Sequence, residues 1–232
     1  MTRRDMTAAP YVGPAEVPAS LLTGYQRFRA QLYPQQAALY QRLEEGQRPR
    51  QMVIACADSR VDPATIFAVS PGELFVVRNV ANLVPPAAGR ASRELAAALA
   101  FAVNQLEVAD IVVIGHGGCG GIAACLALDY AHDHSTDPVA DWVREALPSR
   151  AEVERDLPHA RPAELQRALE HAAIFRSLTN LAGYPSVVAA VGAKRLRLHG
   201  AWFSIGEGRL EWLDQRTRRF VTVPAAPDAP EA

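Results

Sequence analysis

The sequence predicts an α/β fold with a mostly parallel central β-sheet flanked by helices, an N-terminal helical arm and a C-terminal antiparallel hairpin. Apolar and β-branched runs at residues 52–55, 74–77 and 111–114 are typical of buried strands. Segments with helical periodicity separate these runs, and such alternation favours a parallel sheet. Near the C-terminus, Gly-Glu-Gly at 206–208 separates two apolar segments, which is the pattern of a hairpin turn.

The composition is that of an ordinary globular protein, with 49% hydrophobic and 21% charged residues in a chain of 232. The net charge of −1 gives no electrostatic reason to expect a nucleic acid or a membrane as partner. No apolar run approaches the roughly 20 residues that span a bilayer, and residues 1–9 lack the apolar segment of a secretory signal. Three cysteines do not suggest a disulfide framework, so we expect a cytoplasmic protein whose cysteines bind a metal or catalyse.

The chain is expected to divide into three segments. Residues 1–20 contain several prolines and are expected to form a flexible arm, and residues 224–232 a flexible tail. Residues 21–223 are expected to form a single domain. Within it, residues 21–46 suggest two short helices separated near Pro34, with a thin apolar face that favours packing on a partner protomer.

The first half of the domain is expected to alternate strands and helices. After the strand at 52–55, Pro63 opens a short helix, and the Pro-Gly pair at 71–72 makes a turn before the second buried strand at 74–77. Ser92 can cap the next helix. The apolar residues of that helix recur with a 3.6-residue period: Leu95, Ala98, Leu99, Ala102, Val103 and Leu106.

The second half begins with the strand at 111–114, which runs into a glycine-rich turn and a further helix. Residues 130–162 are polar and are expected to form surface helices and loops. A helix then runs from Pro162 to near Gly183. It is followed by a half-exposed strand around Leu198 and by the terminal hairpin.

The glycine-rich turn at 115–121 fits two kinds of site. Its glycines match the G-x-G-x-x-G pattern of dinucleotide-binding loops, but that pattern requires an acidic residue at the end of a strand about 20 residues further on. The chain has no strand there, which disfavours this interpretation. The turn also holds His116 and Cys119, both potential metal ligands, among glycines that let the backbone bend sharply. Such a pair needs partners from elsewhere in the chain.

Cys56 is the expected partner, because it follows the first strand as His116 and Cys119 follow the third. The carboxyl ends of parallel strands share one edge of a sheet, so neighbouring strands would bring these three side chains together. Three protein ligands with one open position are typical of catalytic zinc sites, whereas structural sites have four. Asp58 could be the fourth ligand, or it could pair with Arg60 instead.

The charges of the expected ligands favour a catalytic role for the Asp58–Arg60 pair. Two thiolates cancel the charge of a zinc ion and weaken it as a Lewis acid, so the site needs help to keep a hydroxide bound near neutral pH. An ionised Asp58 can accept the hydrogen bond of that hydroxide, and Arg60 can hold Asp58 through a bidentate contact. If Asp58 binds the zinc directly, as in a closed state, no nucleophile is available.

Three motifs together resemble those of the β-class carbonic anhydrases, over residues 46 to about 221. They are Cys-Ala-Asp-Ser-Arg-Val at 56–61, Gly-His-Gly-Gly-Cys-Gly-Gly at 115–121, and Pro-Gly-Glu-Leu-Phe-Val-Val-Arg-Asn-Val-Ala-Asn at 71–82. The resemblance implies reversible hydration of CO2 to bicarbonate and a proton by zinc-bound hydroxide. It implies that the zinc ligands are Cys56, His116 and Cys119, and that Asp58 and Arg60 form the catalytic dyad.

The resemblance also implies a substrate pocket and an assembly. Gln47 falls where plant-type members keep a substrate-binding glutamine, and Gly120 belongs to the same expected set. Phe75, Val80 and Phe101 fall on positions that line the apolar CO2 pocket, although plant-type members have tyrosine in place of Phe101. Family members build the active site at a dimer interface, so we expect a homodimer or a higher even oligomer.

Two alternatives remain open for the function. A hydrolase of carbonyl sulfide or carbon disulfide on the same fold would have similar site residues. A non-catalytic zinc or thiol sensor would use Cys56 and Cys119, but it would have no need of the Asp58–Arg60 pair. Other candidates have plainer interpretations: Cys125 as a core residue, His132 and His134 as solvated side chains, and Arg78, His199, Trp202 and Trp212 as structural residues.

Some bacterial β-class enzymes are inhibited by bicarbonate at a second site, and the resemblance lets this chain be checked for it. That site uses a tryptophan, an arginine and a tyrosine, where this sequence has Val53, Arg78 and Phe203. Two hydrogen-bond donors are therefore missing, each worth roughly 1.5–3 kcal/mol toward a charged group. We expect no such inhibition, and Asp58 paired with Arg60 across neutral pH.

Overall fold

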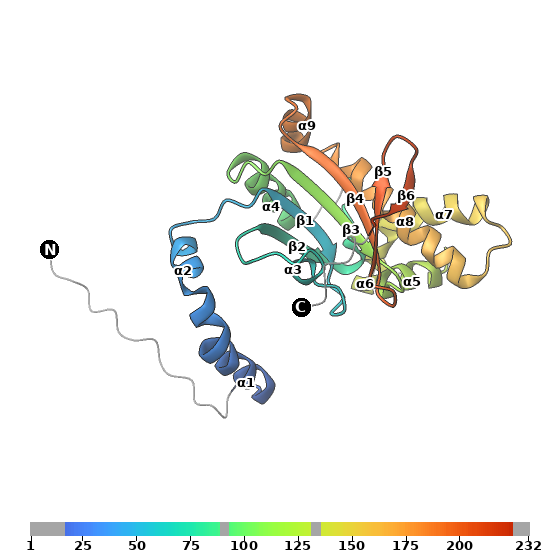
Figure 1. Cartoon of the computed structure of the whole chain (residues 1–232). Helices are drawn as coiled ribbons and strands as arrows, with labels where there is room; N and C mark the ends of the chain where they lie inside the picture. Colours follow the sequence, from blue (N-terminus) through green and yellow to red (C-terminus); the bar gives the residue numbers. More distant parts are fainter. Residues whose placement is uncertain (1–16, 89–92, 131–135, 225–232) are drawn as a thin grey trace. The chain divides into compact units, whose positions relative to one another are not determined.

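The computed structural model describes residues 17–88, 93–130 and 136–224 (Figure 1). The chain divides into two compact units, Met1–Gln47 and Arg48–Ala232. No helix in the described part of the chain combines the length and the apolar character needed to cross a membrane. The predicted roles of Ser92, His132 and His134 fall outside the described residues. The predicted division at residues 20, 46 and 223 remains a prediction.

The described part of the N-terminal unit contains two α-helices that meet just before Pro34, as predicted, although a π-helical turn joins them without a break in the helical backbone. It consists of α1 (Ala19–Arg27), a π-helical turn η2 (Phe28–Leu32) and α2 (Tyr33–Glu44). Pro34 has no N–H to donate and lies in the first turn of α2, so the boundary between the two helices falls where the proline predicts it. None of these residues is buried.

The second unit is built on a six-stranded sheet in the order β2-β1-β3-β4-β5-β6 (Figure 1). The first four strands in this order are parallel, and the last two are antiparallel. This topology confirms the predicted α/β fold with its C-terminal antiparallel hairpin. The strands are β1 (Gln51–Cys56), β2 (Leu74–Asn79), β3 (Asp110–His116), β4 (Arg197–Ser204), β5 (Arg209–Asp214) and β6 (Arg219–Thr222).

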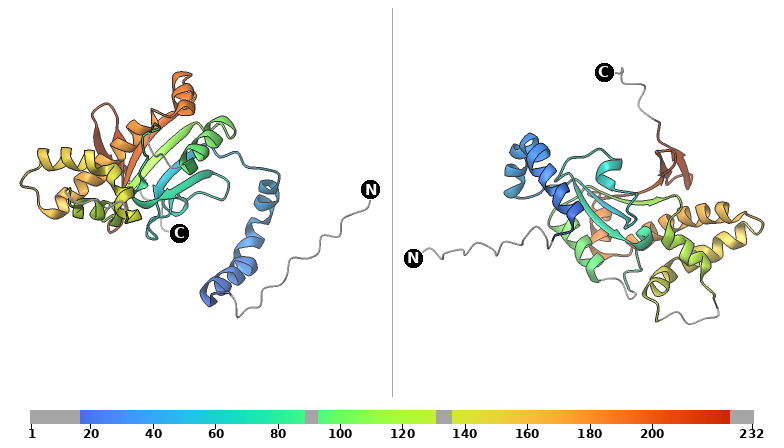
Figure 2. Two further views of the ribbon diagram at one scale, coloured as in Figure 1. Left: turned by 180° about the vertical axis from the view of Figure 1, so that it is seen from behind. Right: turned by 90° about the horizontal axis from the view of Figure 1, so that it is seen from below.

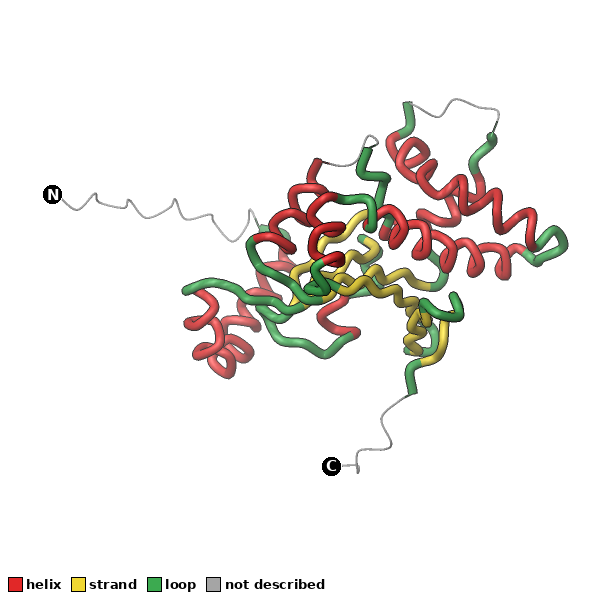
Figure 3. The backbone as a smooth tube through the Cα atoms, turned by 90° about the horizontal axis from the view of Figure 1, so that it is seen from above, coloured by secondary structure: helices red, strands yellow, loops and turns green. Residues whose placement is uncertain are grey.

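Helices connect the strands and gather beside the sheet (Figures 2 and 3). Five of them begin with a proline in the first turn, where its fixed φ suits a helix start. The short apolar helix α9 was not predicted from the sequence. The helices are α3 (Pro63–Ile66), η3 (Val80–Asn82), α4 (Arg93–Asn104), α5 (Gly120–Ala127), α6 (Pro138–Val143), η4 (Arg144–Ala146), α7 (Leu147–Asp156), α8 (Pro162–Leu181) and α9 (Pro185–Gly192).

The main core lies between the sheet and the helices α4, α8 and α9. Side chains from β1 and β3, such as Ile54 and Ile111, meet Leu99 and Ile174 there. Every residue of β3 is buried, as predicted for a central strand. The prediction that β2 is also buried is wrong, because β2 is the edge strand of this sheet and its residues alternate between partly buried and exposed.

The register of the sheet positions the candidate site. β1 lies between β2 and β3, and Ala55 of β1 is paired with Ile114 of β3. The loops that follow β1 and β3 therefore leave the same edge of the sheet side by side. This is the edge at which open parallel sheets bind ligands.

Candidate active site

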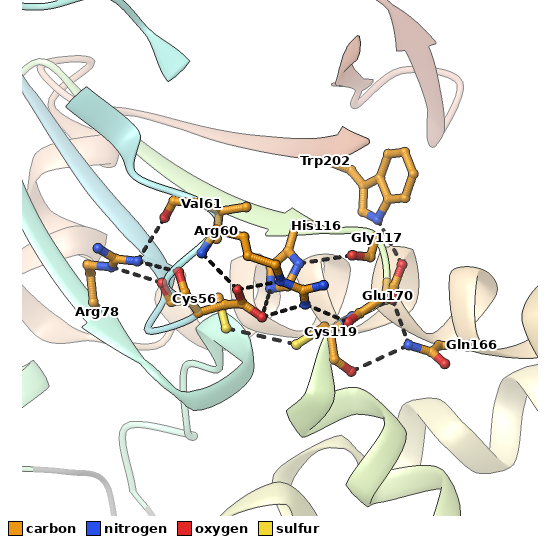
Figure 4. Close-up of polar contacts among 12 residues, drawn as sticks. Cys56, Arg60, Val61, Arg78, His116, Gly117, Cys119, Gln166, Glu170 and Trp202 are labelled. Carbon is orange, nitrogen blue, oxygen red and sulfur yellow. Dashed lines mark hydrogen bonds and ion pairs between the residues drawn. The ribbon is translucent and has the colours of Figure 1, made fainter. Parts of the chain in front are cut away.

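The structure brings Cys56, His116 and Cys119 together, as the strand pattern predicted (Figure 4). Cys56 ends β1, His116 ends β3, and Cys119 precedes the first residue of α5. All three are buried. Their ligand atoms lie within 4.8 Å of one another, and the two sulfur atoms are 3.9 Å apart.

This geometry fits a tetrahedral metal ion. Two sulfur atoms that each lie ~2.3 Å from a tetrahedral zinc would be separated by roughly 3.8 Å, close to the distance observed here. The Nδ1 atom of His116 lies 3.1 Å from the carbonyl oxygen of Gly117, which leaves Nε2 as the ring nitrogen available to bind a metal. Nε2 is buried and has no hydrogen-bond partner. A buried nitrogen without a partner beside two thiols indicates a place for a cation.

The two buried thiols influence each other's ionisation, because their sulfur atoms are only 3.9 Å apart. The Cys119 thiol lowers the pKa of Cys56, against the effect of burial and with help from His116 and the backbone N–H groups of Asp58 and Ala81. The pKa of Cys119 is raised because it lies beside the Cys56 thiolate and is itself buried. A cation bound between them would favour release of the remaining proton, because thiolates are the metal-binding form.

Asp58 pairs with Arg60 and does not join the cluster of Cys56, His116 and Cys119, called the ligand group below. Arg60 Nε donates to Asp58 Oδ1 at 2.9 Å, and Nη2 donates to Oδ2 at 2.7 Å. The backbone N–H of Arg60 also donates to Oδ1, at 3.0 Å. These bonds hold the pKa of Asp58 well below its usual range, so the carboxylate is ionised. Its Oδ2 atom lies 3.8 Å from His116 Nε2, beside the candidate metal site.

Arg78 fastens the loop after β1, the structural role expected for it. Its guanidinium donates to the carbonyl oxygens of Cys56 at 2.9 Å, Asp58 at 2.7 Å and Val61 at 2.8 Å (Figure 4). The loop therefore carries Cys56 and Asp58 in a fixed relation to each other. Arg78 is also the only one of the three positions Val53, Arg78 and Phe203 that matches the second bicarbonate site, and these bonds already engage its guanidinium.

Sequence reasoning missed Glu170, a buried carboxylate that contacts the backbone of Cys119. Glu170 is 4% exposed and lies on α8. Its Oε1 atom accepts a hydrogen bond from the Cys119 N–H at 3.0 Å, and its Oε2 atom accepts one from the Trp202 indole at 3.0 Å. A signal was present, because Gln166, Glu170 and Ser177 place polar side chains at helical spacing along the inner face of α8.

The predicted substrate-binding residues are only partly grouped. The rings of Phe75 and Phe101 lie 5.9 Å apart between centroids. Val80 lies against the start of α5, since a Cβ atom on Gly121 would come within 2.7 Å of its Cγ1. Gly120 is the first residue of α5, and Gln47 is the last residue of the N-terminal unit. Their roles toward a substrate remain predictions.

Comparison with known proteins connects this site with a family. The family model described as carbonic anhydrase matches residues 51–210. A carbonic anhydrase from Pseudomonas aeruginosa is 37% identical over 211 residues, which cover 90% of this chain and 93% of that protein.

Solved structures are similar over most of the chain as well. The β-carbonic anhydrase CcaA superposes with a TM-score of 0.83 at 32% identity, covering 88% of this chain and 98% of that one. A β-carbonic anhydrase from Sordaria macrospora, one of two described as tetrameric, gives a TM-score of 0.76 at 27% identity, covering 84% and 96%.

Proposed function

Since this chain belongs to the β-class carbonic anhydrases, we propose that it catalyses the zinc-dependent reversible hydration of CO2 to bicarbonate and a proton. One observation carries the proposal. Three buried ligand atoms from Cys56, His116 and Cys119 converge within 4.8 Å of one another, beside an ionised carboxylate that Arg60 holds in a bidentate contact. A non-catalytic metal site would need the three converging ligand atoms but not the carboxylate that Arg60 holds beside them.

Cys56, His116 and Cys119 are the residues that would hold the zinc ion. They supply two thiolates and one neutral imidazole, which leaves one of four tetrahedral positions for a reactant. Zinc bound there would act as a Lewis acid that activates a water molecule near neutral pH. The protein orients the imidazole through the contact between its Nδ1 atom and the Gly117 carbonyl.

Asp58 is the residue proposed to handle the proton of the reacting water. Its carboxylate lies next to the ligand group and accepts bonds only from Arg60 among the side chains of the described residues. Arg60 keeps it ionised, so it remains an acceptor across neutral pH. A fixed acceptor at this place would orient the nucleophile toward the carbon of CO2.

The substrate pocket is proposed from the family positions. Phe75, Val80 and Phe101 would provide an apolar surface for CO2, and the family resemblance also assigns Gln47 and Gly120 to substrate binding. The close approach of the Phe75 and Phe101 rings supports the apolar part of this assignment. Phe101 lacks the hydroxyl of plant-type members, so no hydrogen bond from that position contributes here.

We also propose a homodimer or a higher even oligomer, in the cytoplasm. The N-terminal helices bury none of their side chains, which supports packing against a second copy. The Sordaria macrospora relatives are described as tetrameric. Three free cysteines support a reducing compartment.

The absence of bicarbonate inhibition at a second site is proposed as well. Val53 and Phe203 both belong to an apolar cluster on one face of the sheet, and neither offers a donor to an anion. Arg78 is engaged with three backbone carbonyls. Without that site, the pairing of Asp58 with Arg60 persists, and bicarbonate should show no cooperative inhibition.

Stopped-flow measurement of CO2 hydration on protein of measured zinc content tests the proposed function. We expect turnover proportional to the zinc content. A zinc-loaded protein that does not hydrate CO2 would overturn the proposal. Parallel assays with carbonyl sulfide and carbon disulfide separate a hydrolase from an anhydrase, and zinc binding without any of these reactions would indicate a sensor.

A further inference from the structure

We propose that Glu170 is a positioning residue that fixes the ligand turn, residues 116–119, and thereby sets the affinity of the site for zinc. The inference rests on the proposed function, because it takes Cys119 as a ligand. Glu170 would not touch the metal or the substrate. It would act through the backbone of Cys119 and through Trp202 (Figure 4).

Three N–H donors converge on this one carboxylate. The Cys119 N–H and the Gln166 amide reach Oε1 at 3.0 and 3.2 Å, and the Trp202 indole N–H reaches Oε2 at 3.0 Å. The donors come from the ligand turn, from α8 and from β4. Glu170 is the point at which these three elements are tied together.

Two further hydrogen bonds hold the backbone of the ligand turn before and after the Cys119 N–H. Gly117 donates its N–H to the carbonyl oxygen of Phe203 at 2.9 Å, and Gln166 donates to the carbonyl oxygen of Cys119 at 3.4 Å. Gly118 has a φ of +66°, in the left-handed region that favours glycine. The turn that presents Cys119 is therefore a sharp bend, and hydrogen bonds to residues outside the turn maintain its shape.

Trp202 supports the same turn by packing. A Cβ atom on Gly117 would come within 3.0 Å of the indole Cζ2 atom, so the ring lies directly against the backbone there. The guanidinium of Arg167 covers the ring, with Cζ 4.6 Å from its centroid. The indole is held in place, and its N–H is aimed at Glu170.

A carboxylate suits this position better than an amide. An ionised glutamate only accepts hydrogen bonds, so it satisfies every donor that reaches it. A glutamine would present an NH2 group to either the Cys119 or the Trp202 N–H and leave buried donors unpaired, which is unfavourable. The turn would then relax and move Cys119 Sγ away from the metal position.

Metal affinity distinguishes this role from a merely structural one. We would measure zinc binding to Glu170→Gln by competition with a chromophoric chelator, and record the absorption spectrum of the cobalt(II)-substituted protein. We expect zinc affinity to fall by about 10–100-fold, as for other residues that support metal ligands, and the cobalt bands to shift. Circular dichroism of the metal-free protein should remain that of the wild type.

Two further variants complete the test. Glu164→Gln removes an exposed carboxylate from the same helix, where it contacts Arg161, and should leave zinc affinity unchanged. Trp202→Phe removes the indole donor to Glu170 together with the ring atoms that pack on Gly117, and should weaken zinc binding by a smaller factor, about threefold to tenfold. If Glu170→Gln does not fold, Trp202→Phe alone decides.

Wild-type zinc affinity and an unchanged cobalt spectrum in the folded variants would overturn the proposal and leave the proposed function standing. Failure of the wild-type protein to bind zinc would overturn both. The two failures are therefore distinguishable.

Discussion

The guanidinium of Arg60 donates to the carbonyl oxygen of Gly118, with Nη2 3.1 Å from that oxygen, while it also holds Asp58. Gly118 lies in the turn between the proposed ligands His116 and Cys119. One side chain thus ties the proposed dyad to the ligand turn. Arg60 is 53% exposed, so this link depends on its planar bidentate geometry rather than on burial.

Arg60→Lys should therefore lower activity without removing zinc. Lysine keeps the charge, but its single ammonium cannot reproduce both bonds to Asp58 and the bond to Gly118. We expect a decrease in kcat of about 10–100-fold, because Asp58 loses its fixed bidentate partner. Stopped-flow kinetics and elemental analysis measure the two quantities. Arg155→Lys, in an exposed pair with Asp156, is the control and should behave as the wild type. Full turnover in Arg60→Lys would contradict the proposed bridge.

Asp58→Asn should retain zinc and lose most of the activity, by about 100-fold or more. The amide keeps the shape of the side chain but not the anionic acceptor. Zinc content and CO2 hydration are measured on the same sample. Asp62→Asn, four residues away, removes a carboxylate that caps α3 and should keep nearly full activity. If Asp58→Asn lost the zinc or the fold, Asp58 would have a structural or ligand role instead.

Cys119→Ser should lose zinc, since a serine hydroxyl is a much poorer ligand than a thiolate. Elemental analysis should show well below one zinc per chain, and CO2 hydration should be absent. Removing zinc from the wild type with a chelator should abolish activity, and added zinc should restore it. Cys125→Ala is the matched control: Cys125 is also buried, which raises its thiol pKa to about 11, and it lies outside the ligand group. Full zinc occupancy in Cys119→Ser would exclude the proposed ligand set.

The cluster of Cys56, His116 and Cys119 was predictable because its chemistry is local to each motif. Cysteine and histidine are common metal-binding residues. The apolar runs before them indicate parallel strands whose ends share one edge of the sheet. The motif at 56–61 also contains both members of the Asp58–Arg60 pair, which are only two residues apart. Proximity in sequence made this pairing readable.

Other features depend on contacts between distant parts of the chain. Glu170 is 51 residues from Cys119 and 32 from Trp202, and its role follows from the rotation of α8 against the sheet. The exposure of β2 follows from its edge position in the strand order, which no local pattern in β2 reveals. The π-helical turn between α1 and α2 shows a similar limit, because Pro34 predicts a boundary between two helices but not the conformation that joins them.

His171 provides a prediction that concerns stability rather than catalysis. Its ring stacks on Phe220 at 4.1 Å between centroids, and meets the edge of Trp202 at 5.2 Å. The side chain is 23% exposed, and its Nε2 atom lies 3.5 Å from Glu211 Oε2. Burial lowers the pKa of His171 to about 4, with Glu211 acting against this shift and Arg167 adding to it.

The stability of the protein should therefore decrease as the pH falls from about 6.5 to about 4. In this window the unfolded chain binds a proton at His171, whose ordinary pKa is 6.5, whereas the folded protein does not. The contribution is fully present above pH 6.5 and is lost as the pH approaches 4. A pKa lowered from 6.5 to about 4 amounts to at most about 3 kcal/mol in the free energy of unfolding.

Urea unfolding of the wild type and of His171→Phe at a series of pH values measures this effect, and the difference between the two cancels the titration of all other groups. Phenylalanine keeps the packing against Phe220 and cannot bind a proton, so the curve of the variant should be flatter between pH 6.5 and 4. His159→Gln changes an exposed histidine and should follow the wild-type curve. Parallel curves for wild type and His171→Phe would show that His171 does not titrate differently on folding, and that its burial leaves acid stability unaffected.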